Sequence, residues 1–280
     1  MTHNILITGG NGKTGRRISH LLNERNHTVR LGSRSAKPSF DWNNPDTFPA
    51  ILNGMDRAYM AYAPDLAVPG AKDAIHNFTK AALQAGLEKV VLLSGKGEKE
   101  AEACEDIVAN SGLNYTLVRA SWFNQNFSEE GFLLNPILAG QVALPMPDAA
   151  IPYVDAEDIA AVATKALLDD NLNGKTLTVT GPDKLTFKEV VGMIAKATNR
   201  AISYHPVSLQ EYTKMMQSAG LPPDYIWLFE YLFREVLGNP DNQEVSHDVE
   251  MVLGRKPIAF EDFVARTAAT GVWNGEPKTD

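Results

Sequence analysis

Hydrophobic positions in the first two thirds of this chain alternate between short continuous runs and helically spaced segments. The short runs predict strands over Ile5–Thr8, Thr28–Leu31, Arg57–Tyr62, Lys89–Ser94 and Tyr115–Arg119. The helically spaced segments predict helices over Thr14–Asn23, Ala71–Ala85, Glu98–Asn110 and Val154–Leu168, and a further strand is expected over Leu177–Thr180. Strands that alternate with helices predict an α/β fold, here a Rossmann-type doubly wound parallel sheet with ligands at the carboxyl ends of its strands.

The pattern changes after Gly181-Pro182, where one helically spaced segment follows another. Helices are expected over Thr186–Ala197, Ser208–Ala219, Pro223–Leu237 and Phe260–Thr270. The helix over Pro223–Leu237 carries aromatic residues on several faces, which suits a core or dimer helix as well as the wall of an apolar pocket. No linker or low-complexity tract separates the two parts. We therefore expect a sheet domain over residues 1–180 and a smaller, mostly helical, substrate-covering lobe over residues 181–280.

A glycine motif lies between the first strand and the first helix. Gly10, Gly12 and Gly15 have the G-x-G-x-x-G spacing directly after an Ile-Leu-Ile run, which is typical of a turn that binds the pyrophosphate of a dinucleotide at a helix N-terminus. A Walker A loop is disfavoured, because Ile7 stands where that loop needs a glycine. The expected cofactor contacts here are Thr8, Gly10, Asn11, Gly12, Lys13, Thr14 and Gly15.

The end of the second strand indicates which dinucleotide is bound. Roughly 20 residues after the glycine motif, an NAD enzyme places a carboxylate on the ribose 2′-hydroxyl. This chain has Ser33-Arg34-Ser35 there, with no acid. A guanidinium flanked by two hydroxyls suits a 2′-phosphate, which a carboxylate would repel. We therefore expect Ser33, Arg34 and Ser35 to contact NADP(H), which makes residues 1–180 an NADP(H)-binding domain.

Composition excludes several other classes of protein. The 280 residues are 44% hydrophobic and 21% charged, with a formal net charge of −8, so the chain is expected to be globular and lacks the basic surface that nucleic-acid binding needs. The single cysteine, Cys104, excludes an intramolecular disulfide and suits a reducing compartment. The six histidines show no metal-ligand spacing, so no metal is expected. With no leader-like segment or apolar run of membrane-span length, a cytoplasmic location without a membrane partner is expected.

The whole chain resembles the short-chain dehydrogenase/reductase superfamily, in its NmrA-like, atypical extended branch. Three stretches carry this likeness: Ser33-Arg34-Ser35 followed by Phe40-Asp41-Trp42, then the segment from Arg119 to Glu129, and Gly254-Arg255-Lys256-Pro257 with Phe260-Glu261-Asp262-Phe263. They look like the ergot-alkaloid dehydrogenases of the agroclavine and festuclavine type. Triphenylmethane reductases and NADPH quinone reductases look like more distant relatives.

The resemblance implies further site residues. It places Asp41 near the adenine amino group with Trp42 beside it, Tyr62-Ala63-Pro64 over the dinucleotide, and Ser94 near the nicotinamide ribose. A hydrophobic cluster is the alternative reading of Trp42. Trp122, Phe123 and Asn126 follow a strand end and are expected to line the substrate pocket. Tyr153 is the one weak candidate for a catalytic or pocket role, with simple packing as its alternative.

The usual acid of the superfamily is missing. Typical members pair a tyrosine with a lysine four residues later to protonate a carbonyl oxygen, and none of the eight tyrosines here has that lysine. Hydride addition to an iminium or another cationic carbon cancels charge and needs no such acid. Glu102, Glu105 and Asp106 lie in the helix where the pair would belong. They are candidate proton donors or cation-attracting groups, but such a charge run is usually a solvated helix face, and we expect these acids to face solvent.

These features favour an NADPH-dependent reductase of a small electron-poor or cationic organic molecule, such as an iminium, a quinone or a dye. The alternative is an NmrA-like redox sensor that binds NADP(H) without turnover. An isomerase or epimerase with bound NADP(H) is a third reading, weakened by the absent tyrosine base. The sequence leaves the natural substrate and the oligomeric state open, a homodimer included.

Overall fold

The short hydrophobic runs form one parallel sheet. The computed structural model describes residues 2–275, and its main sheet is six-stranded with the order β2-β1-β3-β4-β5-β7, every neighbouring pair being parallel. The strands are β1 (Asn4–Thr8), β2 (Thr28–Gly32), β3 (Arg57–Met60), β4 (Lys89–Gly95), β5 (Asn114–Ala120) and β7 (Lys175–Val179). The chain leaves β1 toward β2 and then returns to β3 on the other side of β1. The strand order therefore reverses between β1 and β3, the point at which doubly wound folds bind ligands.

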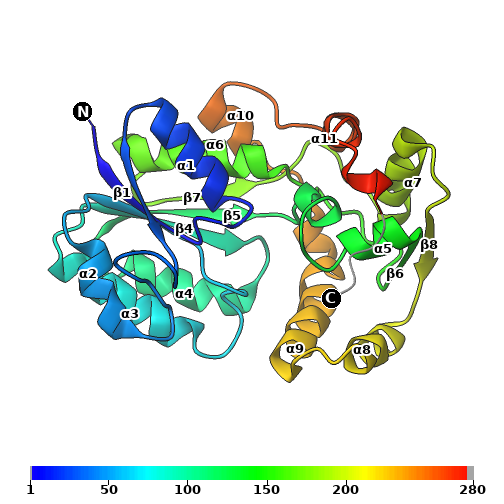
Figure 1. The fold of residues 1–280 in the computed structure, drawn as a ribbon, viewed down its shortest axis with the longest axis horizontal. Helices are drawn as coiled ribbons and strands as arrows, with labels where there is room; N and C mark the ends of the chain where they lie inside the picture. The colour runs from blue at the N-terminus through cyan, green and yellow to red at the C-terminus, as the bar shows by residue number, and fades with distance from the viewer. Residues whose placement is uncertain (1, 276–280) are drawn as a thin grey trace. The chain divides into compact units, whose positions relative to one another are not determined.

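Helices cover both faces of this sheet (Figure 1). On one face lie α1 (Gly15–Glu24), α6 (Ala156–Leu168) and α10 (Asp248–Leu253), and on the other lie α2 (Phe48–Leu52), α3 (Ala71–Gln84) and α4 (Lys99–Ala109). Central strands are buried on both sides, which is why β3 and β4 each continue with consecutive apolar residues after a basic first residue. The expected Rossmann-type fold class is confirmed.

The chain divides into two units that interleave along the sequence. The first unit contains Met1–Ala120, Ala156–Val179 and Asp248–Arg255, and the second contains Ser121–Asp155, Thr180–His247 and Lys256–Asp280. This differs from the single boundary expected between residues 180 and 181. The physical reason is that β7 pairs with β5, so the chain returns to the first sheet after residues 121–155 have joined the second unit.

The second unit is mainly helical but contains a small sheet. Its helices are α5 (Leu134–Ala139), α7 (Phe187–Thr198), α8 (Leu209–Ser218), α9 (Pro223–Tyr231) with a π-helical turn over Leu232–Leu237, and α11 (Phe260–Ala268). Strands β6 (Gln141–Leu144) and β8 (Ser203–Pro206) pair in parallel, and neither was expected from the sequence. Thr186 with Glu189 and Ser208 with Glu211 form capping boxes at the starts of α7 and α8, where the sequence placed helix starts.

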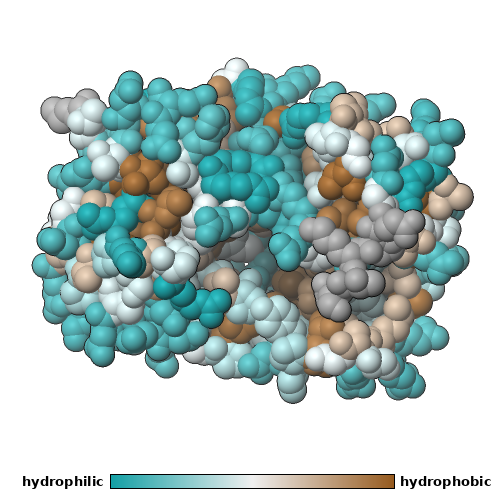
Figure 2. Space-filling view, viewed as in Figure 1, coloured by the Kyte–Doolittle hydropathy of each residue, from teal (hydrophilic) through white to brown (hydrophobic). Residues whose placement is uncertain are grey.

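Short 3₁₀ turns connect several of these elements. They span Pro45–Thr47, Asn124–Phe127, Asp170–Leu172, Pro240–Gln243 and Val272–Asn274. No helix within residues 2–275 has both the length and the apolar character needed to cross a bilayer. The face drawn in Figure 2 is mostly hydrophilic, with hydrophobic side chains in separate small patches.

Candidate functional site

The glycine turn between β1 and α1 has the close packing expected of a phosphate cradle. Gly9 has a φ of +64°, and the N–H of Gly12 donates to the carbonyl oxygen of Gly9 over 2.8 Å. The hydroxyl of Tyr59 on β3 donates to Oγ1 of Thr14 over 2.9 Å, which fixes the entry to the helix. A side chain of the neighbouring strand β3 therefore stabilises the end of the turn.

Two of the glycines cannot carry a side chain without moving this turn. A Cβ on Gly15 would lie 2.3 Å from the carbonyl oxygen of Gly9 and 2.9 Å from the Cα of Gly10. A Cβ on Gly12 would lie 3.1 Å from the same oxygen. Contacts this short require the backbone to shift, so the turn keeps its shape only with glycine at these positions. Because no side chain occupies this space, a pyrophosphate can approach the backbone N–H groups of the turn. The residues present therefore fit a dinucleotide.

Thr8 occupies a different place from its glycine neighbours. It is fully buried, and its hydroxyl oxygen accepts from the N–H of Ala61 over 2.9 Å and lies 3.2 Å from the carbonyl oxygen of Tyr59. Asn11 is exposed and Lys13 half-buried on the turn itself. The Thr8 side chain thus joins β1 to β3, while Asn11 and Lys13 stay predicted cofactor contacts.

The loop after β2 presents Arg34 to solvent. Arg34 and Ser35 are exposed, and Ser33 and Ser35 bring their Oγ atoms within 3.3 Å of each other. No carboxylate within residues 2–275 forms an ion pair with Arg34. The carbonyl oxygen of Ser33 accepts from the N–H groups of Ala36 and Phe40 over 3.1 and 2.9 Å. The loop is thus a fixed turn with an uncommitted cation at the carboxyl edge of the sheet.

Asp41, Trp42 and Tyr62 lie near this edge with partners of their own. Oδ1 of Asp41 accepts from the N–H of Asn43 over 3.0 Å, and Nε1 of Trp42 donates to the carbonyl oxygen of Ala61 over 3.2 Å. The Trp42 and Tyr62 rings are 5.4 Å apart and pack on the hydrophobic cluster of the first unit. Ala63 and Pro64 are exposed directly after Tyr62. The structure thus places Trp42 in a hydrophobic cluster, and its contact with the cofactor stays a prediction.

Ser94 lies at the carboxyl end of β4, in the next strand along the sheet. It is 5% exposed, and its Oγ has no hydrogen-bond partner in the described chain. A buried hydroxyl without a partner is costly, by about 1–3 kcal/mol. The contact of Ser94 with the nicotinamide ribose stays a prediction.

The acidic run on α4 is not a uniformly solvated face. Glu105 is only 3% exposed, and its carboxylate accepts from Nε of Arg119 on β5 over 2.9 and 3.0 Å and also from its terminal NH2 group. Glu102 lies 3.7 Å from the same guanidinium and is half exposed. The expectation that Glu105 faces solvent was therefore wrong, because a guanidinium from the adjacent strand compensates its burial.

Cys104 on the same helix is fully buried. Its Sγ lies 3.8 Å from the carbonyl oxygen of Leu66. Burial raises the pKa of the Cys104 thiol to about 11, which disfavours the reactive thiolate. No group of three or more histidine, cysteine or acidic side chains among residues 2–275 is arranged to hold a metal ion.

The residues expected at the substrate pocket all belong to the second unit. Phe123 forms a parallel bridge with Val154, so the segment after β5 runs beside the segment that contains Tyr153. The half-buried Trp122 ring packs against Phe187 and Phe233, and its Nε1 is buried without a hydrogen-bond partner in the described chain. Asn126 is also half-buried. Trp122, Phe123 and Asn126 thus occupy one short segment, and their contact with a substrate stays a prediction.

Tyr153 lies inside the hydrophobic core of the second unit rather than at its surface. It is 1% exposed, and its ring packs against Phe127, Phe187 and Phe260. Its hydroxyl has no hydrogen-bond partner within the described residues, and burial raises the pKa of Tyr153 well above its usual value. Such a phenol is poorly placed to exchange protons with a bound molecule.

Tyr153→Phe is expected to leave turnover within about threefold of wild type and to raise the free energy of unfolding by up to about 1 kcal/mol, because it deletes a buried hydroxyl without a partner. The matched change Tyr59→Phe removes the hydrogen bond to Thr14 and should lower stability by about 1 kcal/mol. Urea unfolding and steady-state rates of both variants test this. A rate loss of several orders of magnitude in Tyr153→Phe would instead make this tyrosine catalytic.

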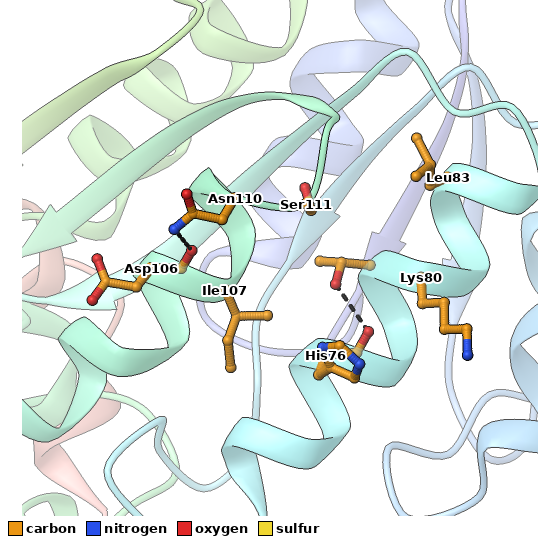
Figure 3. A pocket seen from close by; sticks show the side chains of 8 residues that line it. His76, Lys80, Leu83, Asp106, Ile107, Asn110 and Ser111 are labelled. Atoms are coloured by element: carbon orange, nitrogen blue, oxygen red, sulfur yellow. Dashed lines mark hydrogen bonds between the residues drawn. The ribbon is translucent and has the colours of Figure 1, made fainter.

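A surface groove of about 500 Å³ lies elsewhere on the first unit, between α3 and α4 (Figure 3). The lining side chains labelled in Figure 3 come from both helices, His76 and Lys80 from α3 and Asp106 and Ile107 from α4. None of the residues expected to bind cofactor or substrate lines it. We therefore assign the candidate site to the carboxyl edge of the sheet and not to this groove.

Two curated proteins of similar length match almost the whole chain. Prestalk A differentiation protein A of Dictyostelium discoideum is 28% identical over 280 residues, covering 94% of this chain and 92% of that protein. Agroclavine dehydrogenase of Claviceps fusiformis is 29% identical over 278 residues, covering 93% and 96%.

Solved structures share the fold at lower identity. A nucleoside-diphosphate-sugar epimerase of Staphylococcus aureus has a TM-score of 0.77 at 20% identity, covering 94% of this chain and 99% of that one. The Citrobacter sp. triphenylmethane reductase complexed with NADP(H) has a TM-score of 0.72 at 18% identity, covering 95% and 99%. The NADPH-dependent quinone oxidoreductase QOR2 of Escherichia coli complexed with NADPH has a TM-score of 0.73 at 19% identity, covering 94% and 99%. At these identities the likeness shows the fold.

Family profiles match more than half of the chain. The NAD(P)H-binding profile matches residues 9–170, which contain the glycine turn, the Arg34 loop and Ser94. The NmrA-like family profile matches residues 99–263. The chain therefore belongs to the NmrA-like family and is an NAD(P)H-binding protein of the oxidoreductase class.

Proposed function

We propose that this protein is an NADPH-dependent reductase that transfers hydride to a small electron-poor or cationic organic acceptor, of the iminium, quinone or dye type, without a Tyr-Lys acid pair. The observation that carries the proposal is the carboxyl edge of the first sheet. There the glycine turn fits a pyrophosphate, and an exposed arginine stands where an NAD enzyme has an acid.

Preference for NADPH is supported by the loop after β2. Arg34 offers several fixed donors to a 2′-phosphate dianion, and the serines on either side add hydroxyl donors. Charge-assisted hydrogen bonds of this kind contribute about 1.5–3 kcal/mol each. That range corresponds to roughly a 10- to 100-fold difference in affinity.

Arg34→Ala is therefore expected to weaken NADPH binding by about 10- to 100-fold while changing NADH binding by less than threefold. Isothermal titration with both nucleotides measures the two dissociation constants. Lys37→Ala, an exposed cation of the same loop, is the control and should change neither by more than about threefold. Equal losses for NADPH and NADH in Arg34→Ala would contradict the assignment.

The nature of the acceptor is supported by the chemistry of the chain. Neither Tyr153 nor any other tyrosine has the lysine partner that would make it an acid, whereas a cationic acceptor is neutralised by hydride itself. Catalysis then consists mainly of aligning the nicotinamide C4 with the electrophile. The names of the agroclavine dehydrogenase and the triphenylmethane reductase agree with this acceptor class. We further propose Trp122, Phe123 and Asn126 as residues that contact the acceptor.

NADPH consumption, followed by nicotinamide absorbance, tests the proposal against a cyclic iminium, a quinone, a cationic triphenylmethane dye and a plain ketone. Turnover of the cationic or quinoid members with little turnover of the ketone is the expected result. Tight NADPH binding without turnover of any acceptor would overturn the reductase and favour a redox sensor. Interconversion of sugar epimers without net NADPH consumption would favour an epimerase.

A further inference from the structure

Two carboxyl groups meet in the loops that follow β3 and β4. Asp65 lies in the loop from β3 to α3, and Glu98 is the residue before α4. Their side chains are hydrogen-bonded to each other. An ionised carboxylate can only accept hydrogen bonds, so a bond between two carboxyl groups requires a proton on one of them. A proton on either carboxyl group would satisfy this requirement.

Gly95 fixes the position of the Glu98 carboxyl group. A Cβ on Gly95 would lie 1.8 Å from Oε1 and 2.0 Å from Cδ of Glu98. The carboxyl group thus lies directly against the Cα of the last residue of β4. Although Glu98 occupies the N-cap position of α4, its side chain makes no capping hydrogen bond. The Glu98 carboxyl group is held at the strand end, one residue from the partnerless Ser94 hydroxyl.

The groups around the pair favour its protonated form. Burial raises the pKa of Glu98 well above its usual value, and the neighbouring Asp65 and Glu105 raise it further. Burial also raises the pKa of Asp65, opposed by the N–H of Ala67, which donates to its Oδ1 over 2.8 Å. From α4, Cys104 faces the pair as a neutral thiol, and the charge of Glu105 is compensated by Arg119. The positive charge of Lys72 on α3 acts in the opposite direction to burial and lowers the pKa of the Cys104 thiol.

The order of strands places the Asp65–Glu98 pair at the carboxyl edge of the sheet, on the opposite side of the glycine turn from Arg34. Arg34 follows β2, the glycine turn follows β1, and Asp65 and Glu98 follow β3 and β4. A dinucleotide whose 2′-phosphate meets Arg34 and whose pyrophosphate meets the glycine turn extends its other half past β3 toward β4. That half carries the nicotinamide, which is where hydride leaves and where a proton is needed.

We propose that the hydrogen-bonded Asp65–Glu98 pair is the proton donor for neutral acceptors reduced at this site. This rests on the proposed reductase function. NADPH gives hydride, with two electrons, to a quinone, which becomes a hydroquinone monoanion and leaves NADP+. The carboxyl proton of the pair then forms the O–H bond of the neutral hydroquinone, and a proton from water restores the pair. An iminium or cationic dye is neutralised by the hydride alone and takes no proton.

Glu98→Gln and Asp65→Asn test the proposal, with Glu100→Gln as the control, an exposed acid in the first turn of the same helix. Turnover of a quinone and of a cationic triphenylmethane dye with NADPH is measured for each variant. In Glu98→Gln the ratio of quinone to dye turnover is expected to fall about 100-fold, as loss of a general acid commonly does. In Glu100→Gln the ratio should not change. NADPH affinity and circular dichroism show whether each variant is folded.

Two further readouts separate proton donation from a structural role. In the wild type, quinone turnover should fall as the pH rises through the pKa of the pair, because the protonated form is the active one, and Glu98→Gln should lose this dependence. Infrared difference spectra of wild type against Glu98→Gln at pH 7 should show one protonated carboxyl band. Absence of this band would overturn the proposal. Wild-type quinone turnover with an unchanged ratio in both pair variants would also overturn it. Absence of any wild-type turnover contradicts the proposed function instead, and the infrared band then reports on the pair by itself.

Discussion

Gly15→Ala is expected to weaken NADPH binding by about 100-fold or more. The added methyl group would lie 2.3 Å from the carbonyl oxygen of Gly9 and 2.9 Å from the Cα of Gly10, and both are backbone atoms that cannot rotate away. The turn must therefore open, which moves its N–H groups away from the pyrophosphate. Loss of two charge-assisted hydrogen bonds at about 1.5–3 kcal/mol each accounts for a change of this size. Titration with NADPH measures it.

The same substitution at two other glycines tests whether the close contact is the cause. A Cβ on Gly10 would lie 2.8 Å from Cδ2 of Leu31, an exposed side chain that can turn aside, so Gly10→Ala should weaken binding less than Gly15→Ala. A Cβ on Gly192 in α7 would meet nothing within 4 Å. Gly192→Ala should therefore leave binding unchanged and raise the free energy of unfolding by about 0.5–1 kcal/mol. Unchanged NADPH affinity in Gly15→Ala would contradict the proposal that the glycine turn binds the pyrophosphate.

Asp155→Ala is expected to lower the free energy of unfolding of the protein by about 3 kcal/mol. Asp155 is fully buried in the second unit, where Oδ1 accepts from Nε2 of Gln125 over 2.7 Å and Oδ2 from Arg266 over 2.6 Å. Removing it leaves the buried amide of Gln125 without this acceptor and Arg266 without its counter-ion. Breaking a buried ion pair from one side costs about 3–5 kcal/mol, and the half-exposed Arg266 favours the lower end. Urea unfolding measures the change.

Two controls separate the buried charge from general effects of substitution. Asp155→Asn keeps the shape and an acceptor for Gln125, so its loss should be about half as large. Asp262→Asn changes an exposed acid on α11 and should shift stability by less than about 0.5 kcal/mol. Equal free energies of unfolding for Asp155→Ala and Asp262→Asn would show that the Asp155–Arg266 ion pair does not contribute to stability.

Local sequence patterns were sufficient to predict those helices and strands that are determined by residues close together in the sequence. Consecutive apolar residues predicted the central strands β1, β3 and β4, because a strand that is covered on both faces has few polar side chains. The helices predicted to begin at Thr186 and Ser208 agree with α7 and α8, for which these residues are the N-caps. The short elements β6 and β8 were missed, since four residues carry too little periodicity and their pairing joins segments far apart in the chain. The aromatic segment predicted as one helix over Pro223–Leu237 begins as α9 and continues as a π-helical turn.

The candidate site divides in the same way. The glycine spacing and the arginine after β2 could be read from the sequence, because each prediction depends on residues within a single turn. Glu105 belonged to a charge run that was expected to be solvated, and no role was predicted for Glu98. The structure instead gives Glu105 a guanidinium from β5 and gives Glu98 a carboxyl partner from the loop after β3.

The sequence by itself therefore determined the α/β class, the dinucleotide turn and the family of this protein, all of which follow from neighbours along the chain. The tertiary structure decided which side chains are buried, such as Tyr153 in an aromatic core and Asp155 beside Arg266. It decided as well that the half-buried Asp65 and Glu98 become partners. It also decided that the two units interleave. The physical reason is that burial and partnership depend on packing between distant segments, which no local pattern of residues records.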